Sequence, residues 1–237
     1  MNVSVAMATY NGEKFIKEQI DSILSQLDAE DELIISDDHS KDRTGEIIQE
    51  YTKNDSRVKF FLNDEKGVTS NFENAIKRTQ NEIIFLSDQD DIWKPEKVET
   101  VKSYYKKHPE IYMIMSDITV VDQNLNPTIE SFYQHRGSRT GVLKNIIKNS
   151  YIGCAMSFRK ELKSKVLPIP RNVPMHDMWI GLVADMDKSA MLIPESLVYY
   201  RRHESTVTTV ENTSSLKEKI IWRFQITSLL LQSRMKR

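Results

Sequence analysis

The sequence predicts an α/β fold with a mostly parallel central sheet and helices on both faces. Short apolar runs of strand length alternate with segments of helical period, and polar residues directly follow several of the runs. Strands that are apolar on both faces are typical of parallel sheets buried between helices. Right-handed crossovers between such strands give a Rossmann-like arrangement, and 237 residues suffice for one large domain of this kind.

The first half of the chain alternates strands and helices regularly. The expected strands are residues 3–8, 33–36, 58–62 and 82–87, and the expected helices are residues 13–25, 43–53, 70–79 and 95–107. In the first helix Ile16, Ile20 and Ile23 recur three or four residues apart, which is the helical period. Pro95 favours a helix start at its own position, because proline fits the first helical turn.

The second half is less regular. We expect strands at residues 111–116, 119–121, 151–158 and 197–201, and a helix that opens within residues 176–184. Residues 122–140 are polar and are interpreted as a long loop, a feature that is usually functional or disordered.

The last segment, residues 216–237, contains six Lys or Arg and one Glu. Its Leu216, Ile220, Phe224 and Leu231 fall on one helical stripe. Two interpretations remain open: a helix packed on the domain, or a surface helix in contact with an anionic membrane.

Composition excludes some classes of protein. The 33 Lys and Arg nearly balance the 34 Asp and Glu, so the chain has no bulk attraction for nucleic acid. Cys154 is the only cysteine and cannot form an internal disulfide, which fits a reducing compartment, and we expect a cytoplasmic location. No apolar run is long enough to span a bilayer, and the N-terminus fits a first strand better than a signal peptide.

Polar residues end three of the predicted strands. They are Thr9, Tyr10 and Asn11 after the first strand, Asp37 and Asp38 after the second, and Asp88, Asp90 and Asp91 after the fourth. Ligands of parallel sheets bind outside the carboxyl ends of the strands, and crowded carboxylates there need a compensating cation. An oxygen-rich ligand set favours Mg²⁺ or Mn²⁺, which would hold a diphosphate. The alternative is that these residues only cap helices and form solvated turns.

Several segments resemble family 2 glycosyltransferases, which are inverting enzymes of the GT-A fold that use nucleotide-diphosphate sugars. The matching segments are "VSVAMATYNGEKFIKEQIDSILSQ", "LIISDDHSKDRTGEII", "GVTSNFENAI" and "FLSDQDDIWKPEKV", followed by the islands "YIGCAMSFRKEL", "MHDMW" and "YYRRHESTVT". The resemblance is dense over residues 1–107 and thins afterwards. An Asp-x-Asp motif alone is weak evidence, but four segments in the family order are strong evidence.

The resemblance implies roles for individual residues. Thr9, Tyr10 and Asn11 would line the nucleotide, Asp37 would accept a hydrogen bond from the base, and Asp38 would lie near the ribose or the loop. Asp88 would meet the ribose or the sugar, and Asp90 would bind the metal directly. Arg201 and Arg202 would approach the diphosphate, and His203 the metal. Asp177 of "HDMW" would be the catalytic base, although His176 stands where the family commonly has Glu, and an N-cap is the alternative role.

The resemblance also implies the reaction. We expect an inverting, metal-dependent hexosyl- or rhamnosyltransferase that takes sugar from a UDP- or dTDP-linked donor to a saccharide acceptor during bacterial surface polysaccharide synthesis. Residues 1–212 would form the GT-A domain, with residues 1–107 as the nucleotide-binding half and 108–212 as the acceptor-binding half. Residues 213–237 would form the basic amphipathic C-terminal helix, which would suit a lipid-linked acceptor.

Two other classes compete with this prediction. A sugar nucleotidyltransferase should have a glycine-rich phosphate loop after the first strand, but "TYNGEKF" contains one glycine. A receiver-type binding module carries its Asp pair after the first strand, whereas Asp37 and Asp38 follow the second. A degenerate transferase that binds nucleotide sugar without turnover is separated from the enzyme only by assay.

Overall fold

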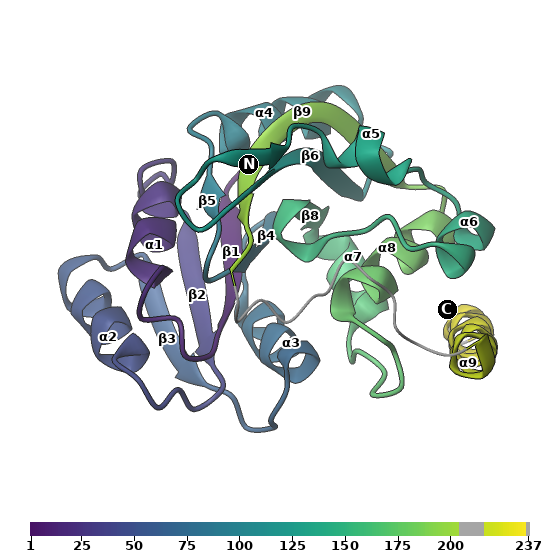
Figure 1. The fold of residues 1–237 in the computed structure, drawn as a ribbon, viewed down its shortest axis with the longest axis horizontal. Helices are drawn as coiled ribbons and strands as arrows, with labels where there is room; N and C mark the ends of the chain where they lie inside the picture. The colour runs from purple at the N-terminus through teal and green to yellow at the C-terminus, as the bar shows by residue number, and fades with distance from the viewer. Residues whose placement is uncertain (204–215, 236–237) are drawn as a thin grey trace.

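The computed structural model describes residues 1–203 and 216–235, with the side chains of residues 216–222 and 233–235 left aside (Figure 1). The strands are β1 (Val3–Thr9), β2 (Glu32–Asp37), β3 (Val58–Leu62), β4 (Ile83–Asp88), β5 (Ile92–Trp93), β6 (Met113–Val121), β7 (Pro127–Ile129), β8 (Met156–Arg159) and β9 (Ala190–Arg201). The helices are α1 (Ile16–Leu24), α2 (Thr44–Asn54), α3 (Val68–Arg78), α4 (Lys97–Lys107), α5 (Phe132–Arg136), α6 (Val142–Ile147), α7 (Lys160–Val166), α8 (His176–Met186) and α9 (Leu216–Met235).

One sheet joins these strands in the order β3-β2-β1-β4-β8-β6-β9-β5, with β7 beside β6. The first four strands in this order are parallel, as the alternation of strands and helices predicted. β8 runs antiparallel between β4 and β6, and β6 is parallel to β9. The mixed α/β architecture with a mostly parallel centre is therefore confirmed, and the carboxyl ends of β1, β2 and β4 meet at one edge.

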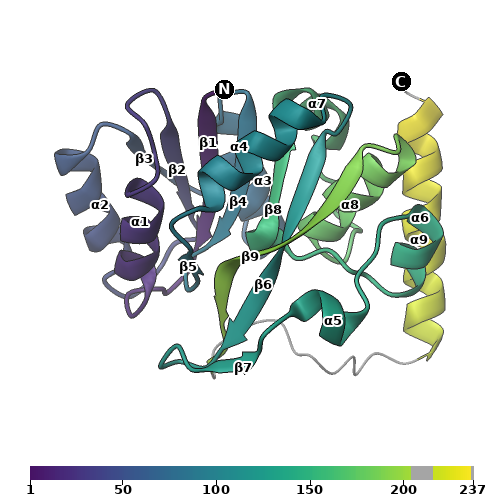
Figure 2. The ribbon, with the colours of Figure 1, turned by 90° about the horizontal axis from the view of Figure 1, so that it is seen from above.

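Helices cover both faces of the sheet (Figures 1 and 2). On one face α1 lies beside α2, where Tyr51 donates to Asp21, and beside α4, where the Val98 amide donates to Gln26. On the other face α3 contacts α8 through the stacked rings of Phe72 and His176. Apolar side chains of all these layers form one core.

The second half of the chain differs in detail from the sequence prediction. The strands predicted at 111–116 and 119–121 form the single strand β6, which begins at Met113. The polar Asp117 within it is buried and accepts hydrogen bonds from Ile118 N, Tyr133 N and Ser131 Oγ. Residues 151–158 were predicted as a strand, but Gly153–Ala155 forms a 3₁₀ turn and pairing starts only at Met156. The expected loop 122–140 contains β7 and α5.

The predicted C-terminal helix is present as α9, while the predicted boundary between residues 212 and 213 lies outside the described residues. Ile226 and Leu230 are buried against the domain. Of the predicted stripe, Phe224 and Leu231 are exposed, and the side chains of Leu216 and Ile220 are outside the description. The helix thus packs on the domain through Ile226 and Leu230, while the two described residues of the stripe are exposed. Within residues 1–203 and 216–235, no helix combines the length and the apolar character that crossing a bilayer requires.

Candidate active site at the carboxyl edge of the sheet

Four carboxylates come together at the carboxyl edge of the sheet. Asp88 ends β4, Asp90 and Asp91 follow it in the next loop, and Asp177 occupies the first turn of α8. His203 follows β9, and its Nε2 lies 2.8 Å from Oδ2 of Asp90, although the two residues are 113 positions apart in the chain. The structure thus joins the two residues predicted as metal ligands.

These carboxylates have few internal hydrogen-bond donors. Burial and the neighbouring charges of Asp91, Asp90 and Asp177 hold the pKa of Asp88 well above its usual range. Burial, followed by the charge of Asp90, raises the pKa of Asp91 to about 7. Oδ1 of Asp91 accepts from the Arg201 amide at 3.0 Å, while its buried Oδ2 has no partner among the described residues. Such an excess of negative charge favours a bound cation.

Lys97 lies beneath this acidic cluster and is 1 % exposed. Its Nζ donates to the Cys154 carbonyl at 2.7 Å and sits 4.1 Å from the centre of the Trp93 ring. Burial lowers the pKa of Lys97 to about 7, against the opposing effect of Asp91 and Asp88. One buried lysine therefore compensates the cluster only in part.

Two donor sets for a metal can be compared. Ligand atoms of Asp88, Asp91 and Cys154 all lie within 4.8 Å of one another. Burial, with the charges of Asp91 and Asp88, raises the pKa of the Cys154 thiol well above its ordinary value, so a thiolate ligand is disfavoured there. Asp90 and His203 instead offer a carboxylate and an imidazole, which suit Mn²⁺. The residues present therefore fit a hard divalent cation near Asp90 rather than a site built on Cys154.

The loops after β1 and β2 are held by side chains predicted to bind nucleotide. Oδ1 of Asp37 accepts from Thr9 Oγ1 at 2.8 Å and from Ser40 Oγ at 2.6 Å, and Oδ2 accepts from the Ser40 amide at 2.8 Å. Thr9 and Asp37 are buried. In this structure Asp37 therefore shapes the loop, and its predicted contact with the base stays a prediction.

Their neighbours are more accessible. Asp38 is part-buried and accepts from Asn63 Nδ2 at 3.0 Å and from the Gly67 amide at 2.9 Å. Tyr10 is 54 % exposed beside them. Asn11 has a positive φ of 48°, a conformation that asparagine tolerates, and its Oδ1 accepts from the Lys41 amide. Tyr10 and Asp38 thus keep exposed surface at the ends of β1 and β2, where a nucleotide was expected.

Gln89 is a residue whose role the sequence analysis missed. Its side-chain amide forms two hydrogen bonds with the backbone of Tyr10, each 2.8 Å long, and so fixes the acidic loop to the end of β1. A side chain at Gly12 would collide with it, since a Cβ there would lie 2.2 Å from Oε1 of Gln89. Only the "x" of Asp-x-Asp marks this position in sequence, so no residue pattern could have indicated the contact.

Asp177 lies at the opening of α8, as predicted. Oδ1 accepts from the Met178 amide at 2.5 Å and Oδ2 from the Gly153 amide at 3.2 Å. Burial outweighs these bonds and raises the pKa of Asp177 to about 6. The preceding His176 is buried, its pKa is lowered to about 3 by burial, and neither ring nitrogen has a partner among the described residues. Asp177 is thus a fixed, part-buried carboxylate with the strength of a general base.

The two arginines before His203 have different environments. Arg201 is 4 % exposed, and its guanidinium pairs with Glu18 at 2.5 Å and covers the Phe15 ring at 4.6 Å. This differs from the predicted contact with a diphosphate, because the guanidinium is already used in packing β9 against α1. Arg202 is part-buried and lies 5.3 Å from the Tyr200 ring, so Arg202 is the better placed of the two for a ligand.

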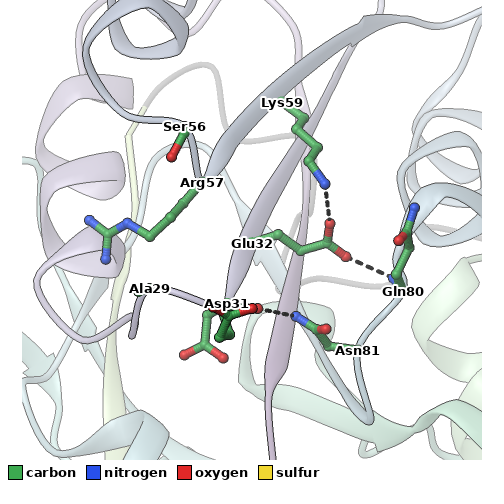
Figure 3. A pocket seen from close by; sticks show the side chains of 9 residues that line it. Ala29, Asp31, Glu32, Ser56, Arg57, Lys59, Gln80 and Asn81 are labelled. Atoms are coloured by element: carbon green, nitrogen blue, oxygen red, sulfur yellow. Dashed lines mark hydrogen bonds and ion pairs between the residues drawn. The ribbon is translucent and has the colours of Figure 1, made fainter.

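A second polar site lies at the opposite edge of the sheet, where a cavity of about 280 Å³ is lined by residues near the starts of β2 and β3 (Figure 3). Glu32 accepts there from Lys59 Nζ and the Gln80 amide, each at 2.7 Å, and from Ser4 Oγ at 2.6 Å. Asp31 accepts from the amides of Val3 and Asp28. Because these carboxylates are satisfied internally and lie far from Asp177, we do not place the active site in this cavity.

Comparison with known proteins gives three kinds of match. Residues 4–167 match the model of the family described as glycosyl transferase family 2. The chain is 25 % identical over 224 residues (93 % of this chain and 87 % of the relative) to TuaG of Bacillus subtilis, a glycosyltransferase assigned to teichuronic acid biosynthesis. It is 27 % identical over 218 residues (87 % and 79 %) to UDP-Glc:alpha-D-GlcNAc-diphosphoundecaprenol beta-1,3-glucosyltransferase WfgD of Escherichia coli.

Solved structures share the fold. S. aureus TarS 1–349 in complex with UDP-GlcNAc superposes with a TM-score of 0.74 at 19 % identity, over 98 % of this chain and 66 % of the S. aureus chain. The mannosyltransferase PcManGT from Pyrobaculum calidifontis, in complex with GDP-Man and Mn²⁺, has a TM-score of 0.64 at 17 % identity, over 99 % of this chain and 64 % of that chain. At these identities the similarity establishes the architecture and not the substrates.

Proposed function

Because the chain belongs to glycosyl transferase family 2, we propose that it transfers a sugar from a UDP- or dTDP-linked donor to a saccharide hydroxyl, with inversion at the anomeric carbon. The donor class is supported by the UDP-glucose enzyme of E. coli and by the UDP-GlcNAc complex of the S. aureus protein. The E. coli and B. subtilis relatives support a role in bacterial surface polysaccharide synthesis. Hexosyl and rhamnosyl transfer both remain within this proposal.

The observation that carries the proposal is the meeting of Asp90, His203 and Asp177 at one edge of the sheet. Asp90 and His203 are in contact at 2.8 Å. Asp177 lies near enough to Asp88 for its charge to raise the Asp88 pKa. A site for the donor diphosphate and a base for the acceptor therefore adjoin each other, as transfer between two bound substrates requires.

Asp90 and His203 would hold Mn²⁺ or Mg²⁺, with Asp88 at the rim of the site. The bound cation would supply charge neutralisation for the nucleoside diphosphate that leaves. Tyr10 and Asp38 would line the nucleotide, and the Gln89 amide would keep the acidic loop in register with β1.

Asp177 performs the proton transfer in this proposal. Its carboxylate accepts the proton of the acceptor hydroxyl while the hydroxyl oxygen bonds to the anomeric carbon and the bond to the diphosphate breaks. The amides of Met178 and Gly153 fix the carboxylate in one orientation. A pKa of about 6 leaves Asp177 mostly ionised at neutral pH while keeping it a stronger base than an exposed aspartate.

The acceptor we propose is a saccharide, in its lipid-linked form if the chain acts as the E. coli relative does on its diphosphoundecaprenol acceptor. Cytoplasmic location and contact with an anionic membrane through residues 216–237 stay predictions. Neither is needed for the transfer chemistry at Asp177.

Donor binding can be tested by thermal shift with UDP, dTDP, GDP and CMP, each with Mn²⁺, Mg²⁺ or EDTA. A ligand of the native state raises its stability, so UDP or dTDP should raise the melting temperature only when metal is present. Asp90→Asn should abolish the metal-dependent part, whereas Glu50→Gln, which removes an exposed carboxylate from α2, should keep it. Protection that is equal in EDTA would contradict the metal site.

A turnover assay separates the competing functions. The proposed enzyme releases UDP or dTDP from the sugar nucleotide when an acceptor is added. A nucleotidyltransferase would instead consume sugar nucleotide only with pyrophosphate, and a degenerate binding module would show protection without release of either product. The last two results would overturn the proposal.

A further inference from the structure

The helices α6 and α9 form one unit at the end of the molecule farthest from α2 (Figures 1 and 2). The Arg223 guanidinium of α9 donates to the carbonyls of Ile146 at 3.3 Å and Ile147 at 2.8 Å, where α6 ends. Ile226 and Leu230 of α9 are buried below this contact. The two helices are therefore in contact, and we call their exposed side chains together the α6–α9 surface.

Large apolar side chains project from the α6–α9 surface into solvent. Leu143 and Ile147 of α6 are 77 % and 67 % exposed, and Phe224 and Leu231 of α9 are 77 % and 59 % exposed. They make up half of the eight exposed large apolar side chains in the described part of the chain. Such a concentration marks a surface that contacts something other than water.

The same region is basic, although the chain as a whole has a net charge of −1. Residues 131–150 contain no Asp or Glu and four Lys or Arg, namely Arg136, Arg139, Lys144 and Lys148. Lys144 and Lys148 are exposed and stand directly after the exposed Leu143 and Ile147. Leu143 and Ile147, four residues apart, thus form an apolar stripe beside the cationic stripe of Lys144 and Lys148, as in helices that lie on anionic membrane surfaces.

We infer that the α6–α9 surface docks on an anionic lipid bilayer. A second copy of the chain is the competing occupant, but a two-fold contact through this surface would bring the same basic patch of both copies together, including Lys144 and Lys148. Like charges facing each other disfavour that contact, whereas anionic headgroups complement both the lysines and Arg139. Charge therefore decides between the two occupants.

The docking surface is joined rigidly to the candidate active site through α8. Asp185 near the end of α8 accepts from the Gly141 amide at 2.8 Å and from Asn145 Nδ2 at 3.2 Å, and these two bonds hold α6 at both its first turn and its middle. Asp177 stands at the other end of the same helix. If the proposed function holds, docking would orient the acceptor side toward a membrane, and this consequence alone rests on it.

Vesicle flotation with the full chain tests the inference. The probes are vesicles of phosphatidylcholine alone and vesicles of equal parts phosphatidylcholine and phosphatidylglycerol. We expect binding to the anionic vesicles only, weakened by salt. The double variant Lys144→Gln/Lys148→Gln should lower the partition coefficient by about tenfold or more, and Leu143→Ser/Ile147→Ser should lower it comparably.

Matched controls use exposed residues elsewhere on the molecule. Lys53→Gln/Lys106→Gln removes the same charge from α2 and α4, and Leu125→Ser removes an exposed apolar side chain from a turn. Both controls should bind anionic vesicles as the parent chain does. Absence of vesicle binding by the parent chain, or an equal loss in the lysine control, would overturn the inference.

Sedimentation velocity without lipid tests whether the α6–α9 surface binds a second copy of the chain instead. A dimer that disappears in Leu143→Ser/Ile147→Ser, with vesicle binding unaffected, would identify a contact between copies and overturn the lipid assignment. Nucleotide protection by thermal shift is independent of both readouts. The inference and the proposed function can therefore fail separately.

Discussion

Both edges of the sheet carry neighbouring acidic residues, but only the amino edge has enough internal hydrogen-bond donors to compensate their charge. At the amino edge, Glu32 accepts from Lys59, Ser4 and the Gln80 amide. Burial alone would raise the Glu32 pKa, but these donors outweigh it and the pKa is lowered. At the carboxyl edge, the pKa of Asp88 is raised because burial and three neighbouring carboxylates act together.

The difference shows how to separate structural from functional carboxylates. Internal hydrogen-bond donors stabilise the charge of a buried carboxylate without any ligand. A buried carboxylate that faces other carboxylates still needs an external cation or a proton. The cavity of about 280 Å³ therefore lies at the edge whose charges are already satisfied, whereas the proposed chemistry lies at the other edge. Matched substitutions at the two edges test this difference.

The largest effect is expected for Asp177→Asn. Loss of a general base costs about 10²- to 10⁴-fold in kcat, while metal-dependent protection by nucleotide should persist. Steady-state release of nucleoside diphosphate measures the first and thermal shift the second. Glu32→Gln, the matched change at the amino edge, should leave kcat per folded molecule unchanged. An Asp177→Asn enzyme within about tenfold of the parent would refute the base role.

A second test uses two buried lysines of the same helix. Lys97 on α4 is 1 % exposed and serves the carboxyl edge, whereas Lys102 is 7 % exposed and reaches Asp28 at 3.4 Å near the amino edge. Lys97→Met should lower the free energy of unfolding by about 1.5–3 kcal/mol, because a charge-assisted hydrogen bond is lost beneath unpaired carboxylates.

Lys102→Met should cost less, about 0–1 kcal/mol, since its partner Asp28 is largely exposed and Asp31 keeps two backbone donors. Urea unfolding at neutral pH measures both variants. An equal decrease in the free energy of unfolding in Lys97→Met and Lys102→Met would contradict the expected difference between the two edges.

The smallest effect is a difference in the pH dependence of stability. The Glu32 pKa is lowered from its ordinary value of 4.5, so its contribution is present above that value and is lost as pH falls through the folded pKa. Glu32→Gln should therefore lie furthest below the parent at neutral pH and approach it in acid.

Asp177 should behave with the opposite sign. Its pKa is raised from 3.8 to about 6, so its contribution is present below 3.8 and is lost as pH rises through 6. Asp177→Asn should gain stability relative to the parent across this window. Urea midpoints at a series of pH values for the three proteins measure both trends, and parallel curves would contradict the assignment.

The residue pattern alone predicted the first half of the fold and brought together the residues of the proposed site. Continuous apolar runs such as 82–87 must be buried on both faces, and the helices between them make neighbouring strands parallel. The carboxyl ends of β1, β2 and β4 then have to meet, which is why Asp88, Asp90 and the residues after Thr9 were predicted together. Asp177 was indicated by family resemblance, because an aspartate at a helix start also serves as a cap.

Which of these groups have hydrogen-bond or ion-pair partners within the molecule depends on how folding brings distant side chains together. Asp37 is held by Ser40 and Arg201 pairs with Glu18, whereas Asp90 meets His203 at the acidic edge. The contact between Asp90 and His203 closes over 113 residues, and the outward direction of Phe224 depends on which face of α9 meets α6. Residue type and spacing fix which groups can bind, whereas distant donors brought close by folding fix which of them remain available, since a satisfied carboxylate gains little from a ligand.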